Sequence, residues 1–248
     1  MRAERGAALL TVVMAMALFL ALGSALVIAT TADIAITANA GASTTAAFAA
    51  SAALDRSLAE LRMAPDVTSV LDGSFTSQFV DGVPIGGRTL ADGSSIDLGR
   101  IVNLANCHKA AGCTPADLAA SFAERPWGGR NPVWRLFSYG PLDGVTGLGP
   151  RGSPVYVTTM VADDPAETDN DPARDGGRTG AAMNPGAGML LVRAEAFGPR
   201  SADRVIDAVV LRLDRREWAR WDAADPAVRG PEPMGLPRLQ VLSWREVR

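Results

Sequence analysis

The sequence predicts an α+β protein in which one long N-terminal helix packs on a mainly antiparallel β-sheet domain. The first observation is the stretch from Arg5 to Arg62, which contains no proline and is rich in the helix formers alanine and leucine. The second is the rest of the chain, where short runs of β-prone residues alternate with turn dipeptides such as Asp81-Gly82 and Asp92-Gly93. A helix followed by a series of strands is the element order of an α+β fold.

The first half of the predicted helix has the properties of a membrane span. From Ala7 to Thr31 there is no charged residue, and at a rise of about 1.5 Å per residue this length crosses a hydrocarbon layer of about 30 Å. We therefore expect residues 7–32 to form the transmembrane half of the helix and residues 33–64 to form its exported half, about 80 Å of helix in all.

The charges that flank the span predict its orientation. Arg2 and Arg5 precede it, whereas the far side carries Asp33 and no basic residue before Arg56. By the excess of positive charge on the cytoplasmic side, the N-terminus stays in the cytoplasm and the remainder is exported. A cleaved secretory signal and an uncleaved anchor are the alternatives, although the apolar stretch of about 25 residues exceeds the usual signal core of about 7–15.

The N-terminal stretch resembles type IV pilin precursors, most closely minor pilins of the PilX type and more distantly the tip pseudopilins of type II secretion. The resemblance covers Arg5–Arg62, about a quarter of the chain, and depends on the segments Arg5-Gly6-Ala7-Ala8-Leu9-Leu10, Ala38-Asn39-Ala40-Gly41 and Ala46–Leu54. Two features depart from the family pattern. The order of Asn39 and Gly41 is altered, and Ser51 or Ala52 stands where the family usually has glutamate.

This resemblance implies a life cycle for the chain. Residues 1–6 would be a leader peptide that prepilin peptidase removes between Gly6 and Ala7, with methylation of the new terminus. The protein would be stored in the bacterial inner membrane as a single-pass subunit and then enter a periplasmic or extracellular fibre through helix contacts with other pilins. Thr11 would become the fifth mature residue, where shaft-forming pilins generally carry glutamate, so we expect a place at the tip or in the initiating complex.

The segment from residue 65 to 248 is expected to form the exported β-rich domain. Pro65 ends the helix, and Thr114 caps a short helix expected over Pro115–Glu124. The predicted strands are Ser74–Val80, Val83–Leu90, Ile96–Leu104, Val133–Tyr139, Pro154–Val161, Met189–Phe197, Arg204–Leu213 and Leu239–Val247. We expect the sheet to pack on the exported half of the helix and to bury Phe48, Leu54 and Leu58.

Cys107 and Cys113 are the only cysteines in the chain. In an exported domain they are expected to form an intrachain disulfide, because the compartment is oxidising. A metal site would need further ligands, and the single histidine, His108, is poorly placed beside Cys107 to complete a tetrahedral set. The Cys-x-x-Cys spacing typical of redox catalysis is absent.

An acidic loop between Asp163 and Asp175 is the most distinctive soluble stretch. Its spacing does not match an EF-hand, because Ala173 and Arg174 occupy positions where that pattern continues with ligands and glycine. Two interpretations stay open: a solvated loop extended by its own repulsion, and a calcium site. The candidate calcium ligands are Asp163, Asp164, Glu167, Asp169, Asp171 and Asp175.

Several classes of function find no support in the sequence. No Gly-x-Ser-x-Gly, phosphate-binding or dinucleotide-binding motif is present, and His108 is the single histidine base, so we do not expect an enzyme. The net charge is −3 and the basic residues are interleaved with acids, so no nucleic-acid contact is expected. The alternatives to a type IV minor pilin are a type II secretion pseudopilin and a signal-anchored periplasmic binding domain or enzyme.

Overall fold

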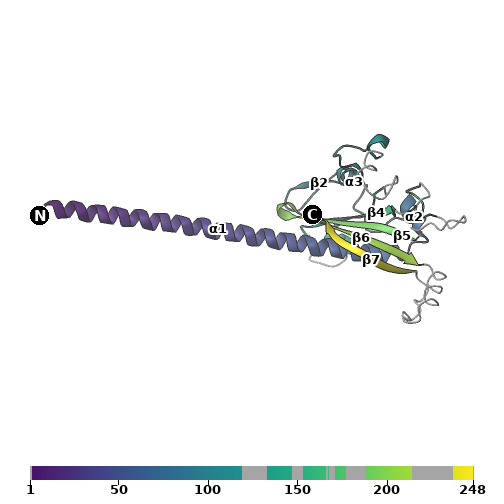
Figure 1. The fold of residues 1–248 in the computed structure, drawn as a ribbon, viewed down its shortest axis with the longest axis horizontal. Helices are drawn as coiled ribbons and strands as arrows, with labels where there is room; N and C mark the ends of the chain where they lie inside the picture. The colour runs from purple at the N-terminus through teal and green to yellow at the C-terminus, as the bar shows by residue number, and fades with distance from the viewer. Residues whose placement is uncertain are drawn as a thin grey trace. The chain divides into compact units, whose positions relative to one another are not determined.

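The computed structural model describes residues 2–118, 133–146, 153–165, 167, 171–176, 188–213 and 237–247. Its first element is α1 (Arg2–Leu61), a continuous helix of 60 residues (Figure 1). The prediction of one unbroken N-terminal helix is confirmed. The chain divides into two compact units, Met1–Ala42 and Ser43–Arg248, and α1 contributes to both.

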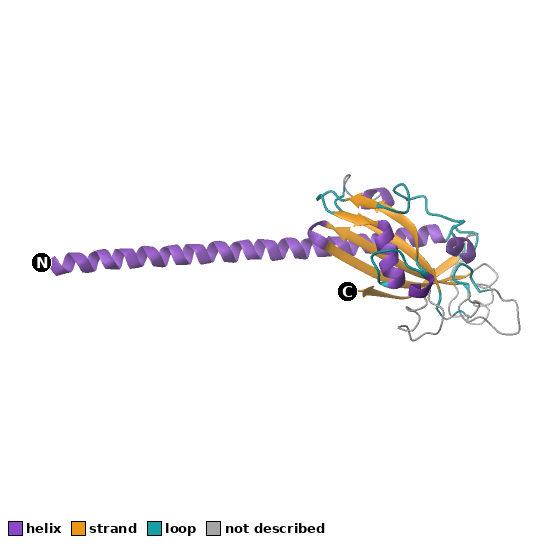
Figure 2. Ribbon diagram, turned by 90° about the horizontal axis from the view of Figure 1, so that it is seen from above, coloured by secondary structure: helices purple, strands orange, loops and turns teal. Residues whose placement is uncertain are grey.

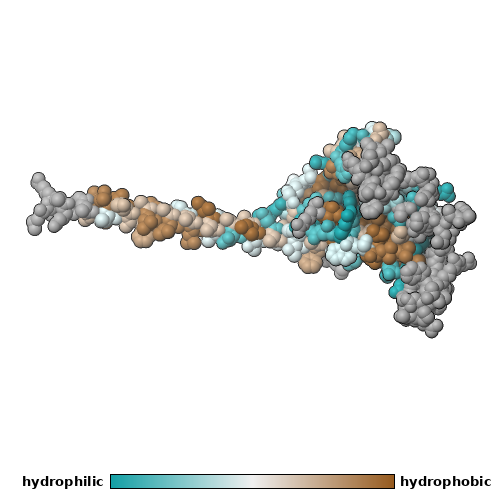
Figure 3. All heavy atoms as spheres, viewed as in Figure 1, coloured by the Kyte–Doolittle hydropathy of each residue, from teal (hydrophilic) through white to brown (hydrophobic). Residues whose placement is uncertain are grey.

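In the first unit, α1 is long and apolar enough to cross a membrane. Apolar side chains on every side of the helix are exposed between Ala8 and Ile36, and Figure 3 shows those on one face. The four hydroxyl groups between Ala8 and Thr31 all donate to main-chain carbonyls three or four residues earlier, at 2.7–3.0 Å, and they belong to Thr11, Ser24, Thr30 and Thr31. Hydroxyls that bond within their own helix lower the cost of transfer into hydrocarbon, so this unit is compatible with lipid.

The second unit is built on a five-stranded antiparallel sheet with the strand order β3-β4-β5-β6-β7. Each strand pairs with its neighbour in sequence, so the sheet is a meander. The prediction of an antiparallel sheet domain behind a long helix is confirmed. The strands are β3 (Arg135–Pro141), β4 (Tyr156–Asp163), β5 (Met189–Gly198), β6 (Ala202–Leu213) and β7 (Arg238–Val247).

The part of α1 that belongs to this unit lies against one face of the sheet (Figure 2). Its contact side consists mainly of small residues, Ala46, Ala49, Ala50, Ala53 and Ser57, which are at most 2% exposed. The sheet meets them with Ala194, Ala196 and Ala208, which are also buried in the same cluster. Small side chains on both surfaces let the helix approach the sheet closely at these positions.

This packing corrects the prediction for Phe48. Its side chain is 73% exposed, whereas Leu54 is 8% exposed and Leu58 is partly buried against the core. At 100° per residue, Phe48 lies nearly opposite the alanine side of α1. The predicted contact face was therefore right for the leucines and wrong for the aromatic ring.

The other face of the sheet is covered by α3 (Leu98–Cys107) and by the hairpin of β1 (Gly87–Thr89) and β2 (Ser95–Asp97). A second apolar cluster forms there, in which Leu98 and Ile101 of α3 pack with Tyr156 and Met160 of β4. Because both faces are covered, all eight residues of β4 are buried. The remaining short elements are α2 (Val67–Asp72), α5 (Leu142–Thr146) and the 3-10 turn η1 (Pro199–Ser201).

The region between α1 and β3 differs from its predicted structure. The run Ile96–Leu104 is mostly helix α3, because the Asp97 side chain caps it by accepting the Arg100 N–H at 2.7 Å. Ser74–Val80 forms no strand beyond a single bridge at Val80, and Val83–Leu90 contributes the three residues of β1. Residues 115–118 are helical as predicted, and Thr114 Oγ1 accepts the Asp117 N–H at 3.2 Å. The rest of Pro115–Glu124 lies outside the described residues.

Candidate functional site

A groove of about 770 Å³ lies on the sheet face opposite α1. We call it the outer-face groove. Apolar residues of α3, β5, β6 and β7, together with Trp134 and Pro165, form most of its walls, and charged side chains of β5, β6 and β7 cross its floor. The lining residues include Trp134, Leu191, Arg193, Asp207, Val209 and Arg245.

One carboxylate holds two arginines in this groove. Arg193 donates to both oxygens of Asp207, at 2.7 and 2.9 Å, in the fork geometry that suits a guanidinium. Arg245 reaches the same carboxylate at 3.3 Å, and its side chain is 76% exposed. Residues 193 and 207 are cross-strand partners, as are 207 and 245. The strand register therefore places all three side chains in one row.

Trp134 forms the wall above this row. The guanidinium carbon of Arg193 lies 4.8 Å from the centre of its ring, a cation–π contact. The main chain of Trp134 is fixed by the buried Asn106, whose amide donates to Trp134 O at 3.0 Å and accepts the Trp134 N–H at 2.7 Å. Asn106 thus bonds the main chain of Trp134 as a neighbouring strand would, and it connects the end of α3 to the groove.

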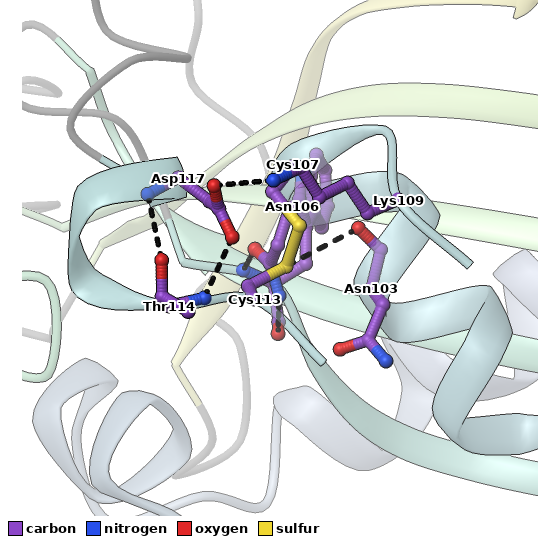
Figure 4. Close-up of a disulfide and its surroundings, with 8 residues drawn as sticks. Asn103, Asn106, Cys107, Lys109, Cys113, Thr114 and Asp117 are labelled. Atoms are coloured by element: carbon purple, nitrogen blue, oxygen red, sulfur yellow. Dashed lines mark hydrogen bonds and ion pairs between the residues drawn. A yellow bond between two sulfur atoms is a disulfide. The ribbon is translucent and has the colours of Figure 1, made fainter. Parts of the chain in front are cut away.

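A disulfide closes the end of α3 next to Asn106. It joins Cys107 to Cys113, whose Cα atoms lie 6.0 Å apart. Figure 4 shows how the closed loop continues into the cap formed by Thr114 and Asp117, and Lys109 pairs with Asp117 at 2.5 Å. The Lys109 ammonium and the Thr114 groups lower the pKa of Asp117 to about 2. The link is structural: it anchors the segment that presents Asn106 to Trp134.

Replacing both cysteines by serine should lower the free energy of unfolding by about 2 kcal/mol, because a loop of this size loses its covalent closure in the unfolded chain. Thermal unfolding of the full chain in lipid nanodiscs, followed by near-ultraviolet circular dichroism, measures this loss. The wild-type chain treated with dithiothreitol is the matched control and should unfold together with the double variant. An unchanged midpoint in both samples would show that the disulfide does not support the fold.

Glu195 lies on the same sheet face, on β5 between its cross-strand neighbours Thr158 and Val205. Burial raises the pKa of Glu195 to about 8, the negative charge of Asp203 adds to this effect, and the Arg193 charge opposes it. Burial also raises the pKa of Asp203. This face of the sheet therefore carries a protonatable carboxyl group beside the Arg193–Asp207–Arg245 row.

Four of the six carboxylates predicted as calcium ligands accept main-chain N–H groups. Glu167 accepts the Gly176 N–H at 2.6 Å, and Asp175 accepts the Gly188 N–H at 2.6 Å. Asp163 Oδ1 accepts the Asp164 N–H, and Asp171 Oδ1 accepts the Ala173 N–H. Within the described ranges, no three acidic, histidine or cysteine residues form a metal-binding group. Asp169 lies outside those ranges, and calcium binding stays a prediction.

The other predicted site residues lie in α1. The main chain of Gly6 and Ala7 is helical, and Thr11 donates its hydroxyl to Ala8 O at 2.9 Å. The charged row and Trp134 were not predicted as a site. The alternation of Arg193 and Glu195 with buried alanines was a signal for an outward-facing row, but sequence alone does not give the strand register that adds Asp207 and Arg245.

Comparison with known proteins does not add a relative to this description. No family model, no curated protein and no solved structure matches the chain.

Proposed function

We propose that this protein is a minor pilin-like subunit that takes part in the assembly of a type IV pilus, at the tip or in the initiating complex. It would be matured by prepilin peptidase between Gly6 and Ala7 and held in the bacterial inner membrane with its N-terminus in the cytoplasm. The domain from residue 65 to 248 would be exported with the second half of the helix.

The observation that carries the proposal is the change in surroundings along α1. Between Ala8 and Ile36 its apolar side chains are exposed on all sides, which costs free energy in water and favours lipid or other helices. Between Ala46 and Leu61 the same helix buries a row of small residues under a sheet. A subunit that moves from a bilayer into a helical bundle requires such a helix.

Phe48 supports the same interpretation. It is 73% exposed on the side of α1 that the sheet leaves uncovered, and an exposed aromatic ring is a common centre of protein contacts. In the proposed fibre, Phe48 would pack against the helices of neighbouring subunits. Thr11 adds an argument for the position in the fibre, because a hydroxyl cannot neutralise the N-terminal ammonium of another subunit as a carboxylate would.

The type II secretion pseudopilin is a second form of the same proposal, because it needs the same helix, the same maturation and the same bundle. A signal-anchored periplasmic binding domain is the competing class. The outer-face groove favours it to the extent that Arg245 keeps exposed donors above apolar walls. Maturation at Gly6 distinguishes this class from the two fibre classes.

Co-expression with a prepilin peptidase should shorten the chain by its first six residues and leave a methylated amine on Ala7. Intact-mass measurement and N-terminal sequencing detect both changes. Gly6→Leu should block them, whereas Gly41→Ala, a glycine change in the same helix far from the junction, should not. A mature chain that keeps Met1 with an active peptidase present would overturn the fibre proposal.

A further inference from the structure

β3 is an edge strand of the sheet. Its outer side pairs with another segment near the C-terminal end of the strand, a side chain bonds the residue just before its N-terminal end, and the stretch between these two points is open. Tyr139 donates its N–H to Phe79 O at 3.1 Å and accepts the Asp81 N–H at 2.9 Å, so residues 79–81 act as a short extra strand. At the other end, Asn106 holds the main chain of Trp134. Among the described residues, no main-chain hydrogen bond joins another segment to the outer side of Arg135–Phe137.

The chain that precedes Phe79 is drawn away from this gap. Glu60 of α1, 7% exposed, accepts the Ser77 hydroxyl at 2.5 Å and the Gln78 N–H at 3.4 Å. Residues 77 and 78 therefore turn toward α1 and do not continue along β3. The same carboxylate also forms an ion pair with Arg56 of α1 at 4.0 Å.

A groove of about 470 Å³ occupies the space that is left, and we call it the edge groove. Its walls are mainly apolar and include Phe75, Val80, Pro84, Val102 and Leu136. Arg135 is the one charged residue among the described residues that line it. The groove thus combines strand main chain, apolar walls and a single positive charge.

Arg135 is held in position by its neighbours. Its Nη1 donates to Leu71 O at 2.7 Å, and its guanidinium packs against Gly73, where any side chain would displace it. A guanidinium has five N–H donors, so further donors stay available for an anion. Asp72 is nearby, but its carboxylate already accepts the Ser74 N–H at 2.7 Å.

We propose that the edge groove binds the C-terminal end of a partner polypeptide, with apolar last residues paired to β3 and the terminal carboxylate on Arg135. Strand addition is the mode of recognition that an open sheet edge offers, and residues 79–81 already use it on the same strand. The gap is about three residues long, or about 10 Å. Asn106 closes one end of the gap and residues 79–81 close the other, so the end of a chain fits the gap better than a strand that continues past it.

The test measures binding of a labelled peptide to the full chain in lipid nanodiscs. The probe is fluorescein-Gly-Gly-Thr-Val-Ile-Val with a free carboxylate, and fluorescence anisotropy reports its binding, with empty nanodiscs as the blank. We expect saturable binding that weakens at least tenfold when the terminus is amidated or the last two amides are N-methylated. Arg135→Gln should cause the same loss.

Two variants of the groove walls and one matched control complete the design. Val102→Glu and Pro84→Glu should each weaken binding at least tenfold, and Pro84 is exposed, so its replacement leaves the core intact. Leu242→Glu on β7, the opposite edge of the sheet, should leave binding unchanged. Absence of saturable binding, equal binding of the amidated peptide, or equal loss in Leu242→Glu would each overturn the proposal. None of these results depends on maturation at Gly6.

Discussion

Leucine in place of Ala50 should cost the sheet domain about 3 kcal/mol of stability and separate α1 from the sheet. Ala50 is fully buried in the cluster that also contains Ala53, Ala194 and Ala196. Added methylene groups in a packed core usually lower the free energy of unfolding by about 1–3 kcal/mol. We expect the upper end of this range where the facing side chains are small and the helix lies close to the sheet.

Thermal unfolding of the full chain, followed by near-ultraviolet circular dichroism, measures this effect. Ala59→Leu is the matched control, because Ala59 lies on the exposed side of the same helix and gains the same three carbons. The control should change the free energy of unfolding by less than about 0.5 kcal/mol. Equal stability of the two variants would mean that the alanine row does not set the distance between helix and sheet.

The central sheet was predictable because its strands carry a local signal. The runs that became β3 to β7 are rich in β-branched and aromatic residues, and turn residues separate them, so their bounds shifted by only a few residues. The segment Ile96–Leu104 carries no such clear signal. Its apolar residues suit a strand or a helix, and the Asp97 cap decided for the helix.

The face of α1 that contacts the sheet illustrates a second limit of prediction from sequence. Large residues such as Phe48 dominate any estimate of a hydrophobic side, yet the face that packs consists of alanines and Ser57. The sheet presents Ala194 and Ala196 at the contact, so the match depends on both surfaces being small. That information is divided between two parts of the chain, and neither part reveals it alone.

The charged row of the outer-face groove depends on strand register. Arg193 and Asp207 lie opposite each other only because β5 and β6 pair as they do, and Arg245 joins them through a ladder with a bulge. A slip of one residue would turn each side chain to the other face. Charges separated by 14 and 38 positions in the chain give no local indication of such a cluster.

Glutamine in place of Glu195 should stabilise the domain at pH 8 by about 4 kcal/mol and leave its stability at pH 4 nearly unchanged. Burial, aided by the Asp203 charge, raises the pKa of Glu195 in the folded chain to about 8, from an ordinary value of 4.5. The folded state therefore holds this proton more tightly than the unfolded state. The contribution of protonated Glu195 to the free energy of unfolding is fully present below pH 4.5 and is lost as the pH rises through about 8.

The measurement is the free energy of unfolding of wild type and Glu195→Gln at intervals between pH 4 and pH 9. Glutamine keeps the size of the side chain and carries no charge, so the wild-type curve should fall with rising pH relative to the variant. Asp92→Asn is the control, because the Ser94 hydroxyl and N–H lower the pKa of Asp92 and reverse the sign of its effect. Parallel curves for wild type and Glu195→Gln would place the Glu195 carboxylate in solvent. Curves that separate above pH 5 would instead show that protonation of one carboxyl on the outer sheet face governs the stability of the domain.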